Sequence, residues 1–175
     1  ERERLAPMRE LASGVIDTSL LSVHELRRSI FSMLEADGER PRMQTRIVSF
    51  GFKYGPPGDA DVVLDVRFLE NPYFVPGLRP LTGLEPKVRD FVLASDDAKA
   101  FLDRAVALLA FSLPRHEREG KSYLTIAIGC TGGQHRSVAM TEALKARVAE
   151  ATGMPVVASH RDVGRARPPD PGGPS

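Results

Sequence analysis

The stretch Ser122–Ser137, with the sequence SYLTIAIGCTGGQHRS, decides the fold class of this chain. Its first half, Ser122–Gly129, is almost continuously apolar, which is typical of a parallel strand buried on both faces. The glycines that follow predict a tight turn, and the apolar spacing beyond them predicts a helix over about His135–Ala151. A buried strand that turns directly into a helix is the repeating unit of an α/β fold.

Sequence patterns typical of strands and helices also occur before and after this stretch. Short runs of apolar and β-branched residues predict strands over Gly14–Thr18, Arg46–Phe52, Asp61–Arg67 and Met154–Ser159. Ser95 is the expected N-cap of another helix, because apolar residues recur after it at helical spacing as far as Leu109. Helices that alternate with buried strands predict the α/β class, with a layered sheet and flanking helices.

The composition is that of a globular protein with a real core. The 175 residues are 42% hydrophobic and 27% charged, and a formal net charge of +1 does not by itself indicate a nucleic-acid partner. No apolar run approaches the roughly 18 residues of a membrane span, so no membrane partner is expected. The single cysteine, Cys130, excludes an internal disulfide and suits a reducing compartment, so we expect a cytoplasmic protein.

The chain is expected to comprise three parts. The segment Asp37–Pro41 (DGERP) interrupts the helical pattern and predicts a domain boundary, and the Pro-rich residues 168–175 predict a disordered tail. The parts are therefore 1–38, 39–167 and 168–175. The chain begins inside a charged helical pattern and has no initiator Met, so we expect it to be a piece of a longer protein.

The segment Gly129–Ser137 (GCTGGQHRS) lies where ligands bind in α/β folds, between the carboxyl end of a strand and a helix. Gly132 and Gly133 allow a ligand to approach the backbone closely, and the free N–H groups of the first helical turn favour an anion. Arg136 adds a planar fork of donors that suits phosphate or carboxylate. We predict an anion-binding loop, and a glycine-containing turn without a ligand is the alternative.

The same loop also admits a catalytic interpretation. Cys130 and Arg136 have C-x5-R spacing and are followed by Ser137, a pattern that resembles the phosphate loop of cysteine-dependent phosphatases. In those enzymes a thiolate attacks phosphorus. Gly129 stands where they usually have His, and a small buried Cys at a strand end is the simpler interpretation. The candidate general acids are dispersed along the chain: Asp59, Asp61 and Asp162.

Two other loops follow predicted strands and carry polar groups. Lys53 is a candidate phosphate contact and Tyr54 a candidate stacking or hydroxyl partner, although a solvated Lys beside a packed aromatic ring fits equally well. Asp65 and Arg67 lie on one face of a strand, so a structural ion pair is their simplest account. His and Cys residues form no cluster with metal-ligand spacing, and we expect no metal or other cofactor.

The C-terminal part of the chain is locally basic. From Lys121 to Pro169 seven basic residues stand against three acidic ones, a local surplus of +4. Such a surplus is typical of a surface that binds a polyanion, and an ordinary solvated surface also explains it.

A set of motifs in one order resembles the RapZ/YvcJ family and covers nearly the whole chain. The motifs include Ser49–Gly55 (SFGFKYG), Asp65–Leu69 (DVRFL), Asn71–Pro72, Leu78–Arg79, Thr82–Gly83, Gly129–Val138 (GCTGGQHRSV) and His160–Asp162 (HRD). Full-length members join a P-loop nucleotide-binding domain, with ATPase and GTPase activity, to a C-terminal domain. The resemblance implies that residues 1–38 are the end of that P-loop domain. It also implies that the remainder has a fold likened to the sugar-binding part of phosphofructokinase.

The resemblance carries functional expectations as well. The best-known member is an RNase adapter whose C-terminal domain binds small regulatory RNA and senses glucosamine-6-phosphate. For this chain it implies a phosphorylated amino sugar or nucleotide sugar as ligand, small RNA and an RNase as partners, and assembly into a dimer or tetramer. The chain contains no G-x-x-x-x-G-K-[ST] motif, so ATP or GTP binding is expected only with the P-loop domain. A C-x5-R hydrolase and a structural oligomerisation domain are the alternative functions.

By motif, the resemblance implies a ligand site that includes Thr131, Gly132, His135 and Arg136, with Tyr54 and Tyr73 on facing loops. The other candidate residues come from the loop and charge arguments above. No residue is assigned a catalytic role. The predicted ligand- or phosphate-binding residues are Lys53, Tyr54, Tyr73, Cys130, Thr131, Gly132, Gly133, His135, Arg136 and Ser137. The predicted RNA-binding residues are His160, Arg161, Arg165 and Arg167.

Overall fold

The computed structural model of the chain describes residues 42–165 without a gap, together with residues 12, 15–19, 21, 25–26 and 29–30. Contacts divide the chain into two units, residues 1–42 and residues 43–175, and the site lies in the second unit. The predicted boundary at 37–41, the tail at 168–175 and the candidate RNA residue Arg167 lie outside the described residues.

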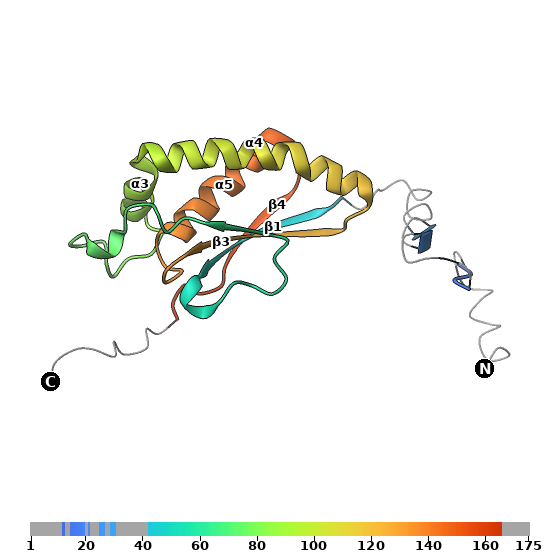
Figure 1. Ribbon diagram of the computed structural model, residues 1–175, viewed down its shortest axis with the longest axis horizontal. Coiled ribbons are helices and arrows are strands. Elements are labelled where there is room, and N and C mark those ends of the chain that lie inside the picture. Colours follow the sequence, from blue (N-terminus) through green and yellow to red (C-terminus); the bar gives the residue numbers. More distant parts are fainter. Residues whose placement is uncertain are drawn as a thin grey trace. The chain divides into compact units, whose positions relative to one another are not determined.

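The second unit is built on a parallel sheet of four strands in the order β2-β3-β1-β4. The strands are β1 (Gln44–Gly51), β2 (Val62–Asp65), β3 (Tyr123–Cys130) and β4 (Val156–His160). Because every pairing is parallel, the carboxyl ends of all four strands meet at one edge of the sheet (Figure 1). The predicted α/β class and the strands predicted over Arg46–Phe52, Asp61–Arg67, Ser122–Gly129 and Met154–Ser159 are confirmed. Residues 15–18 of the strand predicted over Gly14–Thr18 form no strand.

Strand β3 is the centre of the hydrophobic core. All of its residues after Tyr123 are buried, and Ile126 and Ile128 are fully inaccessible to solvent. These two side chains belong to the large core cluster on one face of the sheet, whereas Ala127 packs in a small cluster on the other face. The continuous apolar run in the sequence thus corresponds to a strand covered on both faces.

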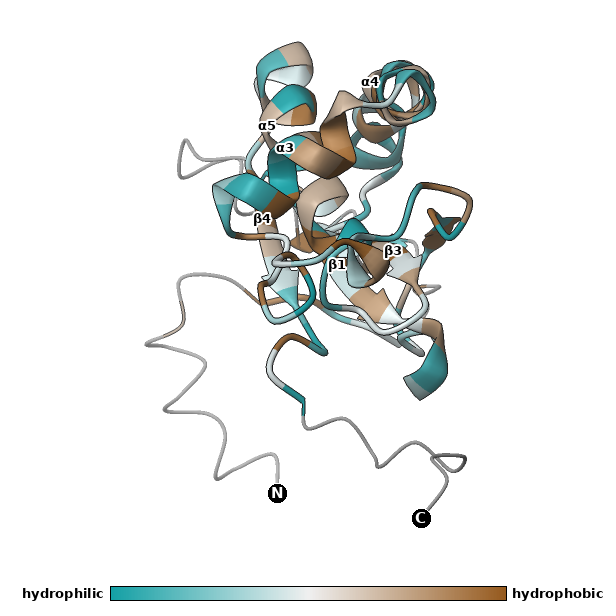
Figure 2. Cartoon of the chain, turned by 90° about the vertical axis from the view of Figure 1, so that its left-hand side faces the viewer, coloured by the Kyte–Doolittle hydropathy of each residue, from teal (hydrophilic) through white to brown (hydrophobic). Residues whose placement is uncertain are grey.

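Three helices form a layer over one face of the sheet, as Figures 1 and 2 show from two directions. They are α3 (Pro86–Ala94), α4 (Asp96–Glu119) and α5 (Arg136–Thr152). Helix α5 packs directly on β1, β3 and β4, and α4 and α3 pack on α5. Ser95 caps α4 as predicted, because its hydroxyl accepts the Ala98 N–H at 3.2 Å. Within the described residues, no helix combines the length and apolar character needed to cross a membrane.

Two segments bring further side chains to the carboxyl edge of the sheet. The short 3-10 helix η1 (Phe52–Tyr54) directly follows β1, and a second one, η2 (Pro72–Phe74), lies in the long connection after β2. This connection is fixed to the loop after β3, since Gly83 N–H donates to the Gln134 carbonyl at 2.8 Å. A Cβ at Gly83 would stand 2.3 Å from the His135 carbonyl oxygen, so only glycine permits this approach.

Candidate functional site

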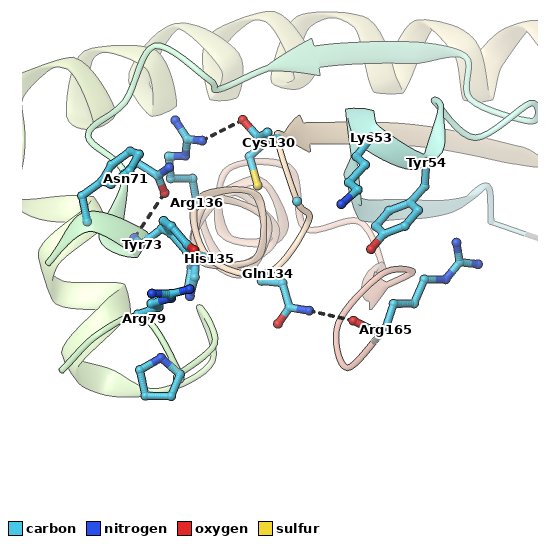
Figure 3. Close-up of a pocket in the computed structure, with 14 residues that line it drawn as sticks. Lys53, Tyr54, Asn71, Tyr73, Arg79, Cys130, Gln134, His135, Arg136 and Arg165 are labelled. Carbon is cyan, nitrogen blue, oxygen red and sulfur yellow. Dashed lines mark hydrogen bonds between the residues drawn. The ribbon is translucent and has the colours of Figure 1, made fainter. Parts of the chain in front are cut away.

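A pocket of about 690 Å³ lies at the carboxyl edge of the sheet (Figure 3). The segments that follow all four strands contribute to its wall. The lining residues are Lys53, Tyr54, Asn71, Tyr73, Phe74, Arg79, Pro80, Cys130, Thr131, Gly132, Gln134, His135, Arg136 and Arg165. The position agrees with the general rule for open α/β sheets, in which ligands bind beyond the carboxyl ends of the strands.

Most of the predicted ligand residues meet in this one pocket. The two that do not line it, Gly133 and Ser137, lie directly behind Cys130 and contact its sulfur. Phe74, Pro80 and Gln134 were not among the predicted site residues, although Gln134 belongs to the predicted anion-binding loop, and Arg165 was placed among the RNA residues. Asn71 and Arg79 belong to the short family motifs Asn71–Pro72 and Leu78–Arg79, and that was the one signal available for them.

The two glycines of the loop after β3 have different roles. Gly133 has a φ of +73°, and a Cβ there would stand 2.7 Å from the Gly51 nitrogen and 2.9 Å from the Asp162 Cβ. This glycine is required by the fold itself. Gly132 lies outside the left-handed region, and a Cβ there would meet no protein atom within 4 Å. The space beside Gly132 is therefore open to a ligand.

Cys130 is packed at the end of β3. Its sulfur is 3.3 Å from the Gly133 N–H that donates to it and 3.1 Å from the Ser137 hydroxyl, and the residue is only 3% exposed. Arg136 is equally buried, and its guanidinium donates to the carbonyls of Arg67 and Leu69 at 2.7 and 2.9 Å. A third bond, at 3.1 Å, reaches the Thr131 hydroxyl.

This geometry bears on the phosphatase interpretation, because a phosphoryl-transfer loop needs its arginine free to bind phosphate. Two guanidinium bonds of Arg136 are already made to backbone carbonyls. None of the pocket residues is Asp or Glu, so no carboxylic acid lines the pocket. The three carboxylates proposed for that role are engaged elsewhere, by Arg46 (Asp59), by Lys121 (Asp61) and by the Gly51 N–H (Asp162). The arrangement favours binding over phosphoryl transfer.

The electrostatic character of the pocket is cationic. Lys53, Arg79, Arg136 and Arg165 line it, whereas no carboxylate does. Within residues 42–165, only Arg165 of these four has an acidic partner within ion-pair distance, at 3.2 Å from Asp162. Low-dielectric walls strengthen such a field, and an anion is the ligand that it attracts.

His135, which precedes helix α5, is a second buried polar group of the pocket. Burial lowers the pKa of its imidazole below the usual 6.5, although hydrogen bonding to the carbonyls of Leu81 and Arg79 acts in the opposite direction. The residue is 8% exposed, and its Nε2 has no hydrogen-bond partner in the described part of the chain. A neutral imidazole with an unused nitrogen can accept from or donate to a ligand group.

Comparison with known proteins identifies the family. A family model described as the RapZ C-terminal domain matches residues 43–164. The chain belongs to the RapZ family. The match covers β1 to β4 and every residue that lines the pocket except Arg165.

The curated relatives are longer than this chain. It is 55% identical over 166 residues to a nucleotide-binding protein of Sorangium cellulosum, covering 94% of this chain and 47% of that protein. It is 55% identical over 163 residues to one of Trichlorobacter lovleyi, covering 93% and 57%. A relative in Streptomyces coelicolor is 53% identical over 165 residues, covering 94% and 54%. This RapZ-family chain spans about half the length of the curated relatives it matches.

Asp162 stabilises the side of the RapZ-family pocket nearest to β4. It is fully buried, and its carboxylate accepts the Gly51 N–H at 2.8 Å and an Arg161 N–H at 2.7 Å. Burial alone would raise the pKa of this carboxyl group, but the bonds from Arg161 and Gly51 and the charge of Arg165 leave the pKa below its ordinary value. Asp162 is therefore a carboxylate at neutral pH, and it ties β1, the loop and the segment after β4 together.

The candidate RNA residues of this family member have varied surroundings. His160 lies between the Ser49 hydroxyl, 2.8 Å from Nδ1, and a Glu142 carboxylate oxygen, 3.1 Å from Nε2. Arg161 donates to Asp162 and also to the Gly55 carbonyl at 2.7 Å. Arg165 lines the pocket. RNA binding by these residues stays a prediction.

Proposed function

We propose that this chain is the metabolite-sensing part of a RapZ-family protein and that its pocket binds a phosphorylated sugar. The charge of the lining supports this proposal above all, since four Arg and Lys side chains and no carboxylate surround the cavity. A neutral sugar would gain nothing from that field, whereas a phosphate group would gain charge-assisted hydrogen bonds.

Different parts of the pocket suit the two parts of such a ligand. The backbone of the loop after β3 and the N-terminus of α5 favour the phosphate, with Lys53 as a direct cationic partner. The amide side chains of Asn71 and Gln134 offer donors and acceptors to sugar hydroxyls, and Tyr54 and Tyr73 offer ring faces. A phosphorylated amino sugar or a nucleotide sugar fits this combination.

The remaining family properties are also proposed. Delivery of RNA to an RNase and assembly into oligomers rest on the resemblance to the RapZ/YvcJ family. Binding of small RNA rests on that resemblance and on the basic C-terminal part of the chain, and a cytoplasmic location rests on the single cysteine. The nucleotide binding in the relatives' names is proposed to reside in the half of those proteins that this chain does not cover. The sequence has no P-loop motif to support it here.

The test is a thermal-shift and calorimetric comparison of matched ligands. Glucosamine-6-phosphate, glucose 6-phosphate and a uridine-diphosphate amino sugar should raise the melting temperature, because a ligand that binds only the folded state stabilises it. Glucosamine without phosphate should have no effect. Lys53→Gln should weaken binding by roughly tenfold, as expected for the loss of one charged hydrogen bond. Lys99→Gln, on the exposed side of α4, is the matched control. If none of the phosphorylated compounds binds, the proposed function is rejected.

A further inference from the structure

Two arginine–tyrosine pairs contribute to the pocket wall. The Arg79 guanidinium lies 4.5 Å from the centre of the Tyr73 ring, and the Arg165 guanidinium lies 5.2 Å from the centre of the Tyr54 ring. An arginine over an aromatic face keeps its N–H groups directed outward from its edge, where they can bind a carboxylate or phosphate. Each pair is therefore a candidate anion-binding group with an apolar ring behind it.

The order of strands places these pairs on opposite sides of the pocket. Strand β3 lies between β2 and β1, so the loop after β3 separates the segment after β2 from the segment after β1. Tyr73 and Arg79 follow β2, whereas Tyr54 follows β1 and Arg165 follows the adjacent β4. Figure 3 shows this separation, with Tyr73 and Arg79 on one side of Cys130 and Gln134 and with Lys53, Tyr54 and Arg165 on the other.

The centre of the pocket is open beside Gly132. Gly132 lies in the intervening loop and lines the pocket, and a Cβ at this position would meet no protein atom. A volume of about 690 Å³ is in the range of pockets that enclose whole drug-sized ligands. The cavity is therefore larger than one phosphate group requires.

We propose that the pocket binds a metabolite with two negatively charged groups, one beside Arg79 and Tyr73 and the other beside Arg165, Lys53 and Tyr54. This inference rests on the proposed function and specifies its ligand class. A sugar bisphosphate has the required chemistry, because a polar ring separates its two phosphates. Within residues 42–165, Arg79 has no acidic partner at ion-pair distance, whereas Arg165 shares its partner Asp162 with Arg161, so each phosphate meets a group that keeps a net positive charge.

The chain contains three tyrosines and no tryptophan, which permits a direct test. Tyr54 and Tyr73 report on the two sides, and Tyr123 lies at the opposite end of β3 as an internal control. With fluorinated tyrosine in the whole chain, inorganic phosphate should shift the ¹⁹F resonances of Tyr54 and Tyr73 but not that of Tyr123. Arg165→Gln should remove only the Tyr54 response, and Arg79→Gln only the Tyr73 response. The proposal would be overturned if phosphate shifted the resonance of only one of these two tyrosines. It would also be overturned if one arginine substitution abolished both shifts.

A second measurement asks whether one molecule occupies both sides. Glucose 1,6-bisphosphate should bind about tenfold or more tightly than glucose 6-phosphate, since it adds one charge-assisted contact. Either arginine substitution should reduce the affinity for the bisphosphate to that for the monophosphate. Equal affinities of the unsubstituted chain for both sugars would reject a two-anion ligand while leaving the proposed function intact. Failure of every phosphate compound to bind would instead reject the proposed function.

Discussion

Arg136 and Arg165 line the same pocket but stand in opposite environments. Arg136 is 5% exposed, and its guanidinium bonds two backbone carbonyls and one hydroxyl. Arg165 has a side chain that is 51% exposed, and it lies over the Tyr54 ring beside Asp162. One arginine thus joins the loop after β3 to the connection after β2, while the other can reorient toward a ligand. Residue type and proximity to a pocket do not by themselves reveal which role a cation has.

The energetic consequence follows from burial. Removal of a buried charged donor leaves its acceptors without partners, whereas an exposed ion pair contributes little because water replaces it. The carbonyls of Arg67 and Leu69 would lose their donor with Arg136. We therefore expect that replacing Arg136 by alanine lowers the free energy of unfolding much more than replacing Arg165 by alanine.

Arg136→Ala should show the largest effect, a loss of roughly 3–4 kcal/mol in the free energy of unfolding, because three hydrogen bonds of a buried charged group disappear. Arg165→Ala should cost less than about 1 kcal/mol. Urea unfolding followed by circular dichroism measures both. Similar losses for the two variants would contradict the distinction between a structural and an exposed arginine. The sequence alone suggested Arg136 chiefly as a ligand contact.

The two glycines of the same loop give the second comparison. Gly133→Ala should destabilise the chain by about 2–3 kcal/mol, because φ is +73° and the new Cβ would press on Gly51 and Asp162. Gly132→Ala should leave the unfolding free energy nearly unchanged and weaken phosphosugar binding instead, because its Cβ would enter ligand space. Melting curves and calorimetry separate the two outcomes. Undiminished binding by Gly132→Ala would show that no ligand approaches that position.

These comparisons also show where sequence reasoning succeeds. The strands and the long helices are visible in the sequence because apolar periodicity is a local property, and Gly129–Ser137 is recognisable because its glycines adjoin a strand and a helix. Helix α3 was missed since Pro86 extends a Pro-rich segment, although Pro is favourable in a first helical turn. The Asp65–Arg67 ion pair was foreseen and is present at 2.6 Å.

What the sequence could not supply are contacts between distant segments. The two carbonyl partners of Arg136 lie 67 and 69 residues away, so no local pattern identifies them. Arg165 enters the pocket because β4 adds to the sheet beside β1, a pairing that depends on the topology of the whole sheet. Its place in a basic segment suggested RNA instead.

A smaller effect is expected at the sulfur in the centre of the loop. Cys130→Ser should change the unfolding free energy by about 1 kcal/mol or less, because the Gly133 N–H and the Ser137 hydroxyl can both bond the new oxygen. Phosphosugar affinity should stay within a factor of about two to three of the unsubstituted value, and the unsubstituted chain should not hydrolyse an aryl phosphate. If the unsubstituted chain hydrolyses the aryl phosphate and Cys130→Ser does not, the interpretation as a C-x5-R hydrolase would be supported instead.

The smallest effect concerns His135, the neighbour of Arg136, and it is a dependence on pH. Burial lowers the pKa of this imidazole in the folded state below 6.5, the ordinary value that applies to the unfolded chain. The unfolded state therefore takes up the proton first as the pH falls, so the stability contribution is complete above pH 6.5 and is lost below it.

Two carboxyl groups with lowered pKa values, those of Glu85 and Asp162, act in a separate pH window. The pKa of Glu85 lies below its ordinary 4.5, chiefly because its carboxylate accepts a hydrogen bond from the Thr82 hydroxyl, and that of Asp162 lies below 3.8. Their contributions to the free energy of unfolding are present when the pH is above these ordinary pKa values and are lost only as the pH falls below them. Unfolding free energies measured between about pH 5 and 6.5 should therefore decline with acidification, and His135→Asn should reduce that slope. An unchanged slope in His135→Asn would mean that the imidazole is as easily protonated in the folded chain as in water, and that its surroundings at the head of α5 are wetter than the structure indicates.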